Sequence, residues 1–138
     1  DCLPVVFRQG KKIAAAHAGW RGLASGILTR AIQRFSKADN IIAWLGPAIS
    51  QKHFEVGEDV YQAFVNINTH SKAAFIPAKD KGKWMADIYQ LARLQLQAAG
   101  VVGIYGGDLC TFNDTERFYS YRRDGAQSGR MASIIVIK

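Results

Sequence analysis

The sequence predicts an α+β fold with mixed β-sheets, formed by a single domain over residues 1–138. Three helical patterns alternate irregularly with about seven strand-like segments, whereas a doubly wound parallel sheet requires regular alternation. Hydrophobic residues make up 49% of the 138-residue chain, which is sufficient for one folded core. No internal repeat or low-complexity linker divides the chain, so we expect one domain.

The N-terminal third predicts a hairpin, a helix and a third strand. Two strand-like segments, Leu3–Phe7 and Lys12–Ala16, are separated by Gln9-Gly10, a pair typical of a tight turn. From Leu23 to Phe35 the apolar residues recur at helical spacing, which predicts one continuous helix. The short apolar run Ile41–Leu45 predicts a buried strand.

The middle of the chain predicts a second helix and a short strand. Gly57-Glu58-Asp59 opens the helix, and its two acidic residues suit the positive end of a helix dipole. The polar stretch Asn66–Lys72 predicts a loop, and Ala74–Ile76 a short strand. Lys79–Lys83 predicts a turn.

The C-terminal third predicts one helix and three strands. Asp87-Ile88-Tyr89-Gln90 resembles a capping box at a helix start, and Gly100 is a natural stop for that helix. The remaining segments are rich in residues that favour strands, which predicts strands at Val101–Tyr105, Phe118–Tyr121 and Ser133–Ile137.

Composition narrows the classes of partner. The net charge of +7 favours anions such as phosphate or nucleotides, but the basic residues are scattered, so we expect no nucleic-acid binding. No apolar stretch approaches ~20 residues, so we expect no membrane partner. Two cysteines make no disulfide framework, which predicts a cytoplasmic protein. We further expect a monomer or weak homo-oligomer that lacks its N-terminal part, since the chain opens within a strand-like motif without Met.

The segment Ile13–Gly22 is the strongest candidate for a site. A small apolar strand delivers His17 to a turn that contains Gly19, Trp20, Arg21 and Gly22. The glycines permit close approach of a ligand, a helix start offers free N–H groups, and an arginine binds phosphate or carboxylate through two parallel hydrogen bonds. Trp20 is equally consistent with a core anchor and with a ring that stacks on substrate.

Cys2 brings a thiol to the same part of the chain. It is a candidate zinc ligand together with His17, or a nucleophile with His17 as its base. A catalytic zinc usually has three protein ligands, and the remaining histidines, His53 and His70, lie in polar segments that favour surface exposure. We therefore expect the third ligand to come from sequence outside this chain.

The run Phe118–Gly125 is the second candidate region. Arg122, Arg123 and Asp124 at a strand end are consistent with a loop that contacts substrate, and equally with a solvated turn that holds a surface ion pair. Asp108 and Cys110 follow a strand and a Gly-Gly break, and we expect them to line the same cleft as this loop.

Five ordered motifs carry a resemblance to a known family. The chain resembles the YfiH family, also called the laccase-domain or polyphenol-oxidase family, through DCLP, HAGWRG, LGPAI, FEVG and FYSYRRDG. The resemblance implies a layered α/β/β/α fold and a zinc site made by two histidines and one cysteine. In this sequence the cysteine is Cys2 and one histidine is His17, and the other family histidine precedes Asp1.

The resemblance also implies an activity. Members are similar to zinc-dependent enzymes that phosphorolyse adenosine, inosine, guanosine or methylthioadenosine and deaminate adenosine. Catalytic roles are then implied for Cys2, His17 and Arg21, and contacts to purine nucleoside and phosphate for Gly19, Trp20, Gly22, Arg122, Arg123 and Asp124.

Three alternatives remain. One is a Cys-His hydrolase that acts as an amidase on cell-wall peptides, and another is a non-enzymatic anion- or nucleotide-binding module. The third is a copper-dependent polyphenol oxidase. Copper is less favoured than zinc, because the chain has three histidines and no His-x-His pair.

Overall fold

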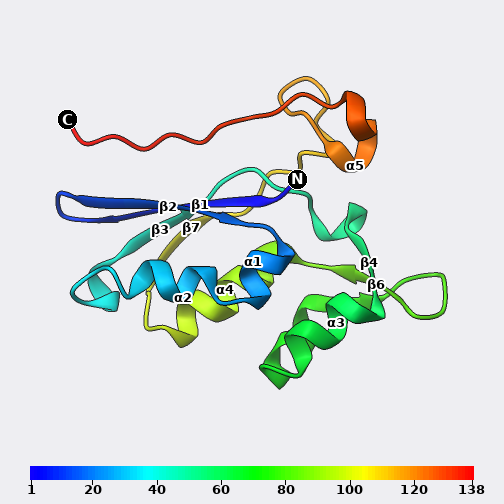
Figure 1. Ribbon diagram of the computed structural model, residues 1–138, viewed down its shortest axis with the longest axis horizontal. Helices are drawn as coiled ribbons and strands as arrows, with labels where there is room; N and C mark the ends of the chain where they lie inside the picture. Colours follow the sequence, from blue (N-terminus) through cyan, green and yellow to red (C-terminus); the bar gives the residue numbers. More distant parts are fainter.

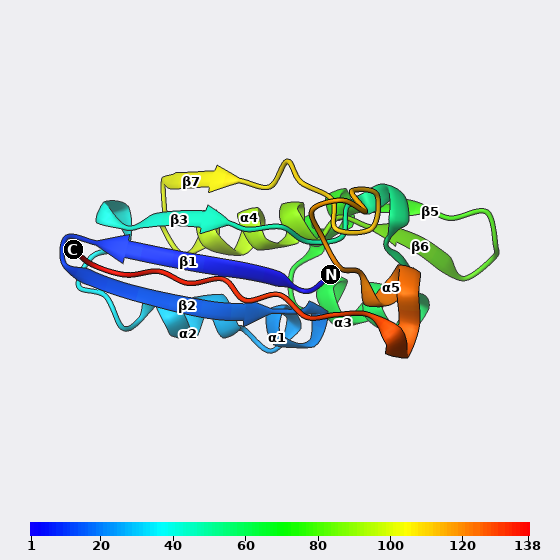
Figure 2. The same ribbon diagram turned by 90° about the horizontal axis from the view of Figure 1, so that it is seen from above.

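The computed structural model describes residues 1–138 and contains two β-sheets (Figures 1 and 2). The larger sheet has the order β2-β1-β3-β7, in which β1 is antiparallel to both neighbours and β3 is parallel to β7. Its strands are β1 (Leu3–Gln9), β2 (Lys12–Ala18), β3 (Ile42–Leu45) and β7 (Gly103–Gly106). The α+β fold with mixed sheets is therefore confirmed.

The β1–β2 hairpin assigns each of its side chains to one of two faces. Pro4 lies opposite His17, and Leu3 lies opposite Ala18. Because side chains alternate along a strand, the buried Leu3 and Ala18 point to the inner face, whereas Cys2 and His17 point to the outer face and are exposed. The two residues expected to form the site therefore lie on the same side of the sheet.

Helices cover only the inner face of the larger sheet (Figure 1). They are α1 (Trp20–Ala24), α2 (Ile27–Ile32) and α4 (Ile88–Ala98). The continuous helix predicted from Leu23 to Phe35 is wrong, because the chain breaks at Gly26. Gly26 has φ 79°, a left-handed conformation that only glycine adopts readily, and it separates α1 from α2.

Helix α4 follows the sequence prediction closely. The Asp87 side chain accepts a hydrogen bond from the Gln90 backbone N–H at 2.9 Å, as an N-cap does. Gly100, with φ 87°, ends the helix. The buried face of α4 consists of Ile88, Tyr89, Leu91, Ala92 and Leu96.

The smaller sheet has the order β4-β6-β5 and lies beyond one end of the larger sheet (Figures 1 and 2). Its elements are β4 (Glu55–Gly57), α3 (Glu58–Val65), β5 (Phe75–Pro77) and β6 (Lys83–Ala86). The helix that opens at Glu58 is confirmed, whereas β4 and β6 were not predicted. Part of the predicted loop Asn66–Lys72 belongs to a 3₁₀ turn, and such turns occur at Ala38–Asn40, Gln51–His53, Thr69–Ala74 and Gly125–Gln127.

The C-terminal segment differs most from the sequence prediction. Instead of a strand, Phe118–Tyr121 leads into the short helix α5 (Tyr121–Asp124), whose first turn is capped by the Ser120 side chain. Ser133–Ile137 is extended but pairs with no strand, and it runs along the outer side of β1 and β2 (Figures 1 and 2). Apolar β-branched residues favour strands only where a neighbouring strand offers hydrogen bonds and packing.

The outer face of the larger sheet carries exposed apolar side chains. Ile42, Trp44 and Tyr105 are 50%, 40% and 59% exposed, respectively. No helix and no second sheet lies over this face, so the stacked α/β/β/α order implied by the family resemblance stays an expectation. No helix in the structure is long and apolar enough to span a membrane.

Tyr89 of α4 joins the loops that follow β3 and β7. Its phenol oxygen accepts a hydrogen bond from the Ala48 N–H at 2.7 Å and donates to the Leu109 carbonyl at 2.8 Å. Burial raises the pKa of Tyr89 to about 12, and the hydrogen bond from Ala48 offsets only part of that rise. The folded state therefore favours the neutral phenol.

Replacing Tyr89 by phenylalanine is expected to destabilise the fold by about 1–3 kcal/mol, because the buried Ala48 N–H loses its acceptor. Urea unfolding measures the difference. The folded pKa exceeds the unfolded value of 10, so the phenol's stabilisation is complete below pH 10 and is lost as pH rises through about 12. The gap between the two proteins should therefore narrow above pH 10, and a gap that stays constant would contradict the buried phenol.

Candidate functional site

The side chains of Cys2 and His17 converge over Gly19. A Cβ atom placed on Gly19 would lie 2.8 Å from Cys2 Sγ and 3.8 Å from His17 Nε2, so both atoms face one point. The antiparallel register of β1 and β2 produces this arrangement, because it places the start of β1 beside the end of β2. Cys2 Sγ and His17 Nε2 therefore lie near each other, and their function as a site stays a prediction.

The donor types of this pair fit zinc, but their number is short of a full site. Zinc binds thiolate sulfur and imidazole nitrogen, and catalytic sites usually use three protein ligands. No group of three or more His, Cys, Asp or Glu side chains within residues 1–138 is placed to hold a metal ion. His53 stacks on Phe112 at 4.4 Å between ring centroids, and His70 forms a hydrogen bond with Asn68.

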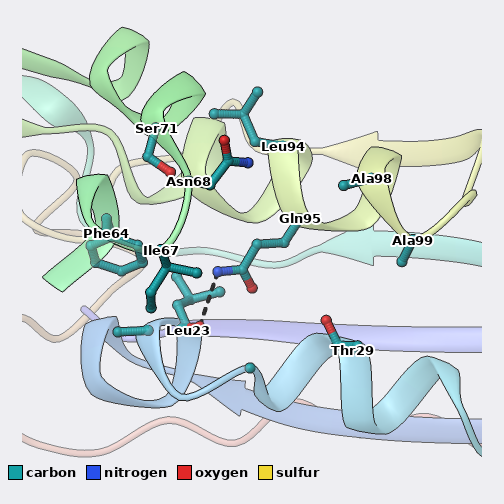
Figure 3. A pocket seen from close by; sticks show the side chains of 12 residues that line it. Leu23, Thr29, Phe64, Ile67, Asn68, Ser71, Leu94, Gln95, Ala98 and Ala99 are labelled. Carbon is teal, nitrogen blue, oxygen red and sulfur yellow. Dashed lines mark hydrogen bonds between the residues drawn. The ribbon is translucent and has the colours of Figure 1, made fainter.

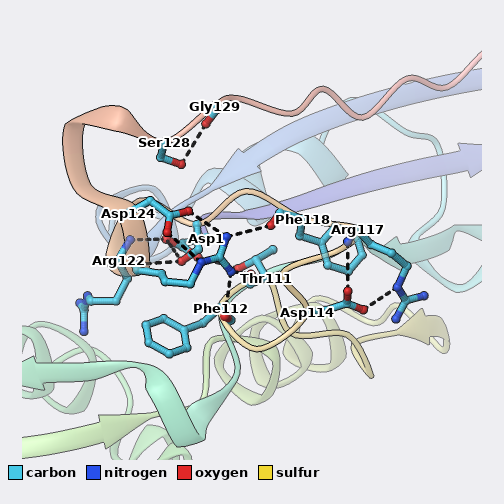
Figure 4. Close-up of polar contacts among 12 residues, drawn as sticks. Asp1, Thr111, Phe112, Asp114, Arg117, Phe118, Arg122, Asp124, Ser128 and Gly129 are labelled. Atoms are coloured by element: carbon cyan, nitrogen blue, oxygen red, sulfur yellow. Dashed lines mark hydrogen bonds and ion pairs between the residues drawn. The ribbon is translucent and has the colours of Figure 1, made fainter.

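Asp1 ties the start of β1 to the C-terminal loop (Figure 4). Its carboxylate accepts hydrogen bonds from the Thr111 hydroxyl at 2.6 Å, the Ser120 hydroxyl at 3.0 Å and the Arg122 backbone N–H at 2.8 Å. Thr111 and Ser120 are both 0% exposed. We call these four residues the Asp1 clamp.

Asp1 is a residue of this region whose role the sequence did not reveal. Its position immediately before the candidate ligand Cys2 was the one indication of a role in the sequence. Its hydrogen-bond partners could not be predicted, because a partner such as Ser120 is far away in the chain. In the structure the Asp1 clamp holds the backbone next to Cys2, which makes Asp1 a positioning residue for the thiol.

The two adjacent arginines of the C-terminal loop hold that loop together. The Arg123 guanidinium donates to the carbonyls of Thr111 and Phe112 at 3.1 and 2.9 Å, and pairs with Asp124 at 2.8 Å. The hydrogen bond from Arg123 lowers the pKa of the Asp124 carboxyl. The Arg122 guanidinium donates to the Glu55 carbonyl at 2.9 Å. These contacts give all three charged side chains, Arg122, Arg123 and Asp124, a role in shaping the loop.

Trp20 and Arg21 follow His17 closely in the sequence. The Arg21 guanidinium stacks over the Trp20 ring at 4.3 Å, and the Trp20 side chain packs partly against the core. Arg21 is exposed and forms no hydrogen bond or ion pair with its side chain, which leaves its donors available to an anion. Helix α1 spans only five residues, so Arg21 supplies more of the positive charge than the helix dipole.

Asp108 and Cys110 line a cavity of about 330 Å³ to which the loop of Arg122, Arg123 and Asp124 does not contribute. Neither Cys2 nor His17 belongs to its lining. The expected common cleft is therefore wrong. The reason is that successive side chains of an extended segment point in opposite directions. Thr111 points to Asp1, and the preceding Cys110 points to Ser50.

A second cavity, of about 250 Å³, lies among α1, α2, α3 and α4 (Figure 3). The Gln95 side chain crosses it and donates to the Leu23 carbonyl at 2.9 Å. Apolar and uncharged polar side chains make up its whole lining, including Phe64, Ile67 and Leu94. Without an acid, a base or a thiol, this cavity offers no group for catalysis.

Replacing Gly19 by alanine is expected to displace the Cys2 thiol, because the new methyl group would lie 2.8 Å from the sulfur. The backbone of Gly19 suits any residue at φ −64°, so the fold should tolerate the change. We expect the variant to bind zinc at least about tenfold more weakly than the unchanged protein, because mutations that disturb the residues supporting a metal ligand typically lower metal affinity by about 10–100-fold. The urea midpoint of unfolding should stay the same. The control is Ala15→Gly, which lies on the same hairpin and changes no metal donor. Gly10→Ala is unsuitable, because Gly10 has φ 59°, a conformation that alanine rarely adopts. Unaltered zinc affinity in Gly19→Ala would contradict the convergence.

Comparison with known proteins adds independent findings. The sequence pattern of the family described as "Multi-copper polyphenol oxidoreductase laccase" matches residues 1–138. The chain is 53% identical to "Purine nucleoside phosphorylase YfiH" of Escherichia coli K12, over 98% of the chain and 56% of that relative. It is 50% identical to a purine nucleoside phosphorylase of Pseudomonas aeruginosa, over 98% of the chain and 57% of that relative.

Solved structures agree with the sequence matches. A crystal structure of a Neisseria meningitidis protein superimposes with a TM-score of 0.87 at 50% identity, covering 91% of this chain and 53% of that one. The crystal structure of Bacillus licheniformis hypothetical protein YfiH gives a TM-score of 0.83 at 30% identity, covering 90% of this chain and 50% of that one. The chain therefore spans little more than half the length of the relatives it matches.

Proposed function

Because the chain belongs to the multi-copper polyphenol oxidoreductase laccase family, which includes the YfiH proteins, we propose that it forms part of a zinc-dependent purine nucleoside phosphorylase. The proposed substrates are phosphate and adenosine, inosine, guanosine or methylthioadenosine, with adenosine deamination as a side activity. The observation that carries the proposal is the convergence of Cys2 Sγ and His17 Nε2 over Gly19. Arg21, two residues after Gly19 in the chain, is exposed and carries an unpaired guanidinium.

In the proposed reaction, Cys2 and His17 would hold the zinc ion, which would supply Lewis-acid chemistry when bound. The Arg21 guanidinium binds phosphate through two parallel hydrogen bonds. An oxygen of hydrogen phosphate bonds to ribose C1′ while the glycosidic C–N bond breaks, and the purine leaves with the electron pair of that bond and takes up the proton that the phosphate loses. Trp20 fixes the Arg21 side chain by stacking, and the Asp1 clamp fixes the backbone beside Cys2.

The remaining zinc ligand is proposed to come from polypeptide outside residues 1–138. Two donors converge here, whereas a catalytic zinc usually binds three from protein. The pair lies on the outer face of the larger sheet, along which the C-terminal segment runs and which no helix or second sheet covers. Cys2 and His17 are both exposed there, so another segment has access to them. The relatives are long enough to contain such a segment, because the chain covers only 56% of the E. coli protein.

A second candidate function rests on the same two residues. A thiol and an imidazole that face one point also suit a Cys-His hydrolase, in which Cys2 attacks an amide and His17 accepts its proton. Metal dependence separates the two functions, because a chelator should abolish phosphorolysis and leave thiol-based hydrolysis intact. A multicopper site uses more histidines than the three in this chain, so it would need more ligands from outside residues 1–138 than a zinc site would.

The test compares the 138-residue chain with a chimera in which it replaces the matched region of the E. coli relative. Ribose 1-phosphate formation from adenosine and inosine is measured together with bound zinc and copper. Activity of the chimera that follows its zinc content supports the proposal. Metal-free turnover would assign Cys2 as a nucleophile, and copper-dependent phenol oxidation without phosphorolysis would refute the proposal.

A further inference from the structure

The cavity among α1, α2, α3 and α4 contains a buried hydrogen-bond acceptor that has no partner. The Gln95 Oε1 atom is buried and accepts no hydrogen bond within the protein. The other end of the same amide is engaged, because Nε2 donates to the Leu23 carbonyl at 2.9 Å (Figure 3). Turning the amide over would bring two carbonyl oxygens together, so this hydrogen bond keeps Oε1 as the free end of the side chain.

Ser71 is a second polar residue of this cavity without a partner. Its side chain is buried, with 7% of the residue exposed, and its hydroxyl forms no hydrogen bond within the protein. Buried polar groups in folded proteins are normally paired with protein, water or a ligand. Two unpaired groups in one cavity, from α4 and from the 3₁₀ turn Thr69–Ala74, therefore indicate that the cavity accepts a molecule that forms hydrogen bonds.

The rest of the lining defines the chemical character of that molecule. Most of the lining is apolar, with Leu23 and Phe64 from the core and Ile67, which is 70% exposed. A ligand that covers Ile67 removes apolar surface from water, which favours binding. No charged side chain lines the cavity, so an ion would lose its hydration without gaining a counter-charge. The cavity therefore favours a neutral and mainly apolar ligand.

The volume of the cavity sets the size of the ligand. It is about 250 Å³, whereas an apolar cavity of about 150 Å³ in a protein holds one benzene molecule. One ring with a small substituent therefore fits, and a drug-sized molecule, which occupies pockets of roughly 300–1,000 Å³, does not.

We propose that this cavity binds a neutral compound of one substituted ring, whose hydroxyl group donates a hydrogen bond to Gln95 Oε1. The ring packs against the apolar side chains of Leu23, Phe64 and Leu94. Neither Cys2 nor His17 lines this cavity, so the proposed site is separate from that of the proposed phosphorylase.

The experiment titrates the chain with p-cresol and with toluene, which differ only by the hydroxyl group. Both are neutral at pH 7, because a phenol has a pKa of about 10. Heteronuclear NMR gives the two affinities, and shifted amide signals in residues 64–71 and 94–99 locate the ligand. Toluene is the more apolar probe, so a cavity without a free acceptor would favour toluene.

We expect p-cresol to bind at least about threefold more tightly than toluene, as one net hydrogen bond allows. Gln95→Met removes the acceptor at similar volume and should make toluene the tighter ligand. The matched control is Gln97→Met on the same helix, which is exposed and lies outside the lining, and it should keep the preference for p-cresol. Urea unfolding of each variant checks that the fold is retained.

A second variant tests the volume of the cavity. Ala98 is exposed on α4 and lines the cavity, so Ala98→Leu adds side-chain volume there without entering the core. It should weaken both ligands by at least about tenfold. Binding of neither probe, with water alone in the cavity, or toluene at least as tight as p-cresol in the unchanged chain, would overturn the proposal. Neither result would bear on phosphorolysis, which is measured separately.

Discussion

Replacing His17 by alanine is expected to lower zinc-dependent phosphorolysis by more than about 100-fold, since disturbing even a ligand's support costs about 10–100-fold. His17 Nε2 and Cys2 Sγ face one point, so the substitution removes half of the donors that this chain supplies. His17 is exposed on the outer face of β2, and its loss empties no core space. Urea unfolding should therefore remain cooperative with a nearly unchanged midpoint.

The measurement is phosphorolysis and zinc content of the chimera that carries His17→Ala. The matched control is His70→Ala, which removes an imidazole that binds only Asn68 and lies outside the site. The control should retain both zinc and activity. Full activity of His17→Ala with its zinc retained would eliminate the Cys2–His17 pair as the metal site. Full zinc loss with unchanged turnover would instead favour a metal-free mechanism.

Replacing Asp1 by alanine is expected to give the largest loss of stability among the polar residues of the site. The Thr111 and Ser120 hydroxyls are buried and would lose their carboxylate acceptor, and the Arg122 N–H would lose its partner. Each buried polar group without a partner costs about 1–3 kcal/mol, so we expect a total of about 2–5 kcal/mol. Urea unfolding measures this cost, and hydrogen exchange in residues 118–128 locates it.

The control for Asp1 is Asp39→Ala, which removes an exposed carboxylate from a 3₁₀ turn with no hydrogen bond to its side chain. That variant should change stability by less than about 0.5 kcal/mol, as surface substitutions do. Asp1→Asn keeps one acceptor oxygen and should fall between the two. If Asp1→Ala is as stable as Asp39→Ala, the Asp1 clamp does not hold the loop.

The sequence predicted correctly those features that depend on interactions between residues close together in the chain. The N-cap at Asp87, the stop at Gly100 and the acidic first turn of α3 depend on residues within one helical turn, and all are present in the structure. The β1–β2 hairpin depends on alternation and one tight turn, and its register placed Cys2 near His17 as expected. The family motifs also carried the resemblance, which the comparisons confirm.

The strand predictions failed where pairing over long distances decides. Ser133–Ile137 has the composition of a strand but no neighbour to pair with, and Phe118–Tyr121 turns into α5 because the Asp1 clamp holds Ser120 and Arg122. Strands β4 and β6 form because they pair with each other across intervening α3 and β5. The residue types of a segment do not reveal which distant segment it will pair with.

The sequence by itself determined the α+β class, the start of α3, both ends of α4 and the nearness of Cys2 to His17. Only the tertiary structure decided which face of the sheet carries that pair, that Asp1 binds Thr111 and Ser120, and that Cys110 opens into a different cavity. The physical reason is the distance along the chain over which each interaction acts. Caps and turns act between neighbours in the chain, whereas a carboxylate meets a hydroxyl more than a hundred residues away only after the core has brought the two segments together.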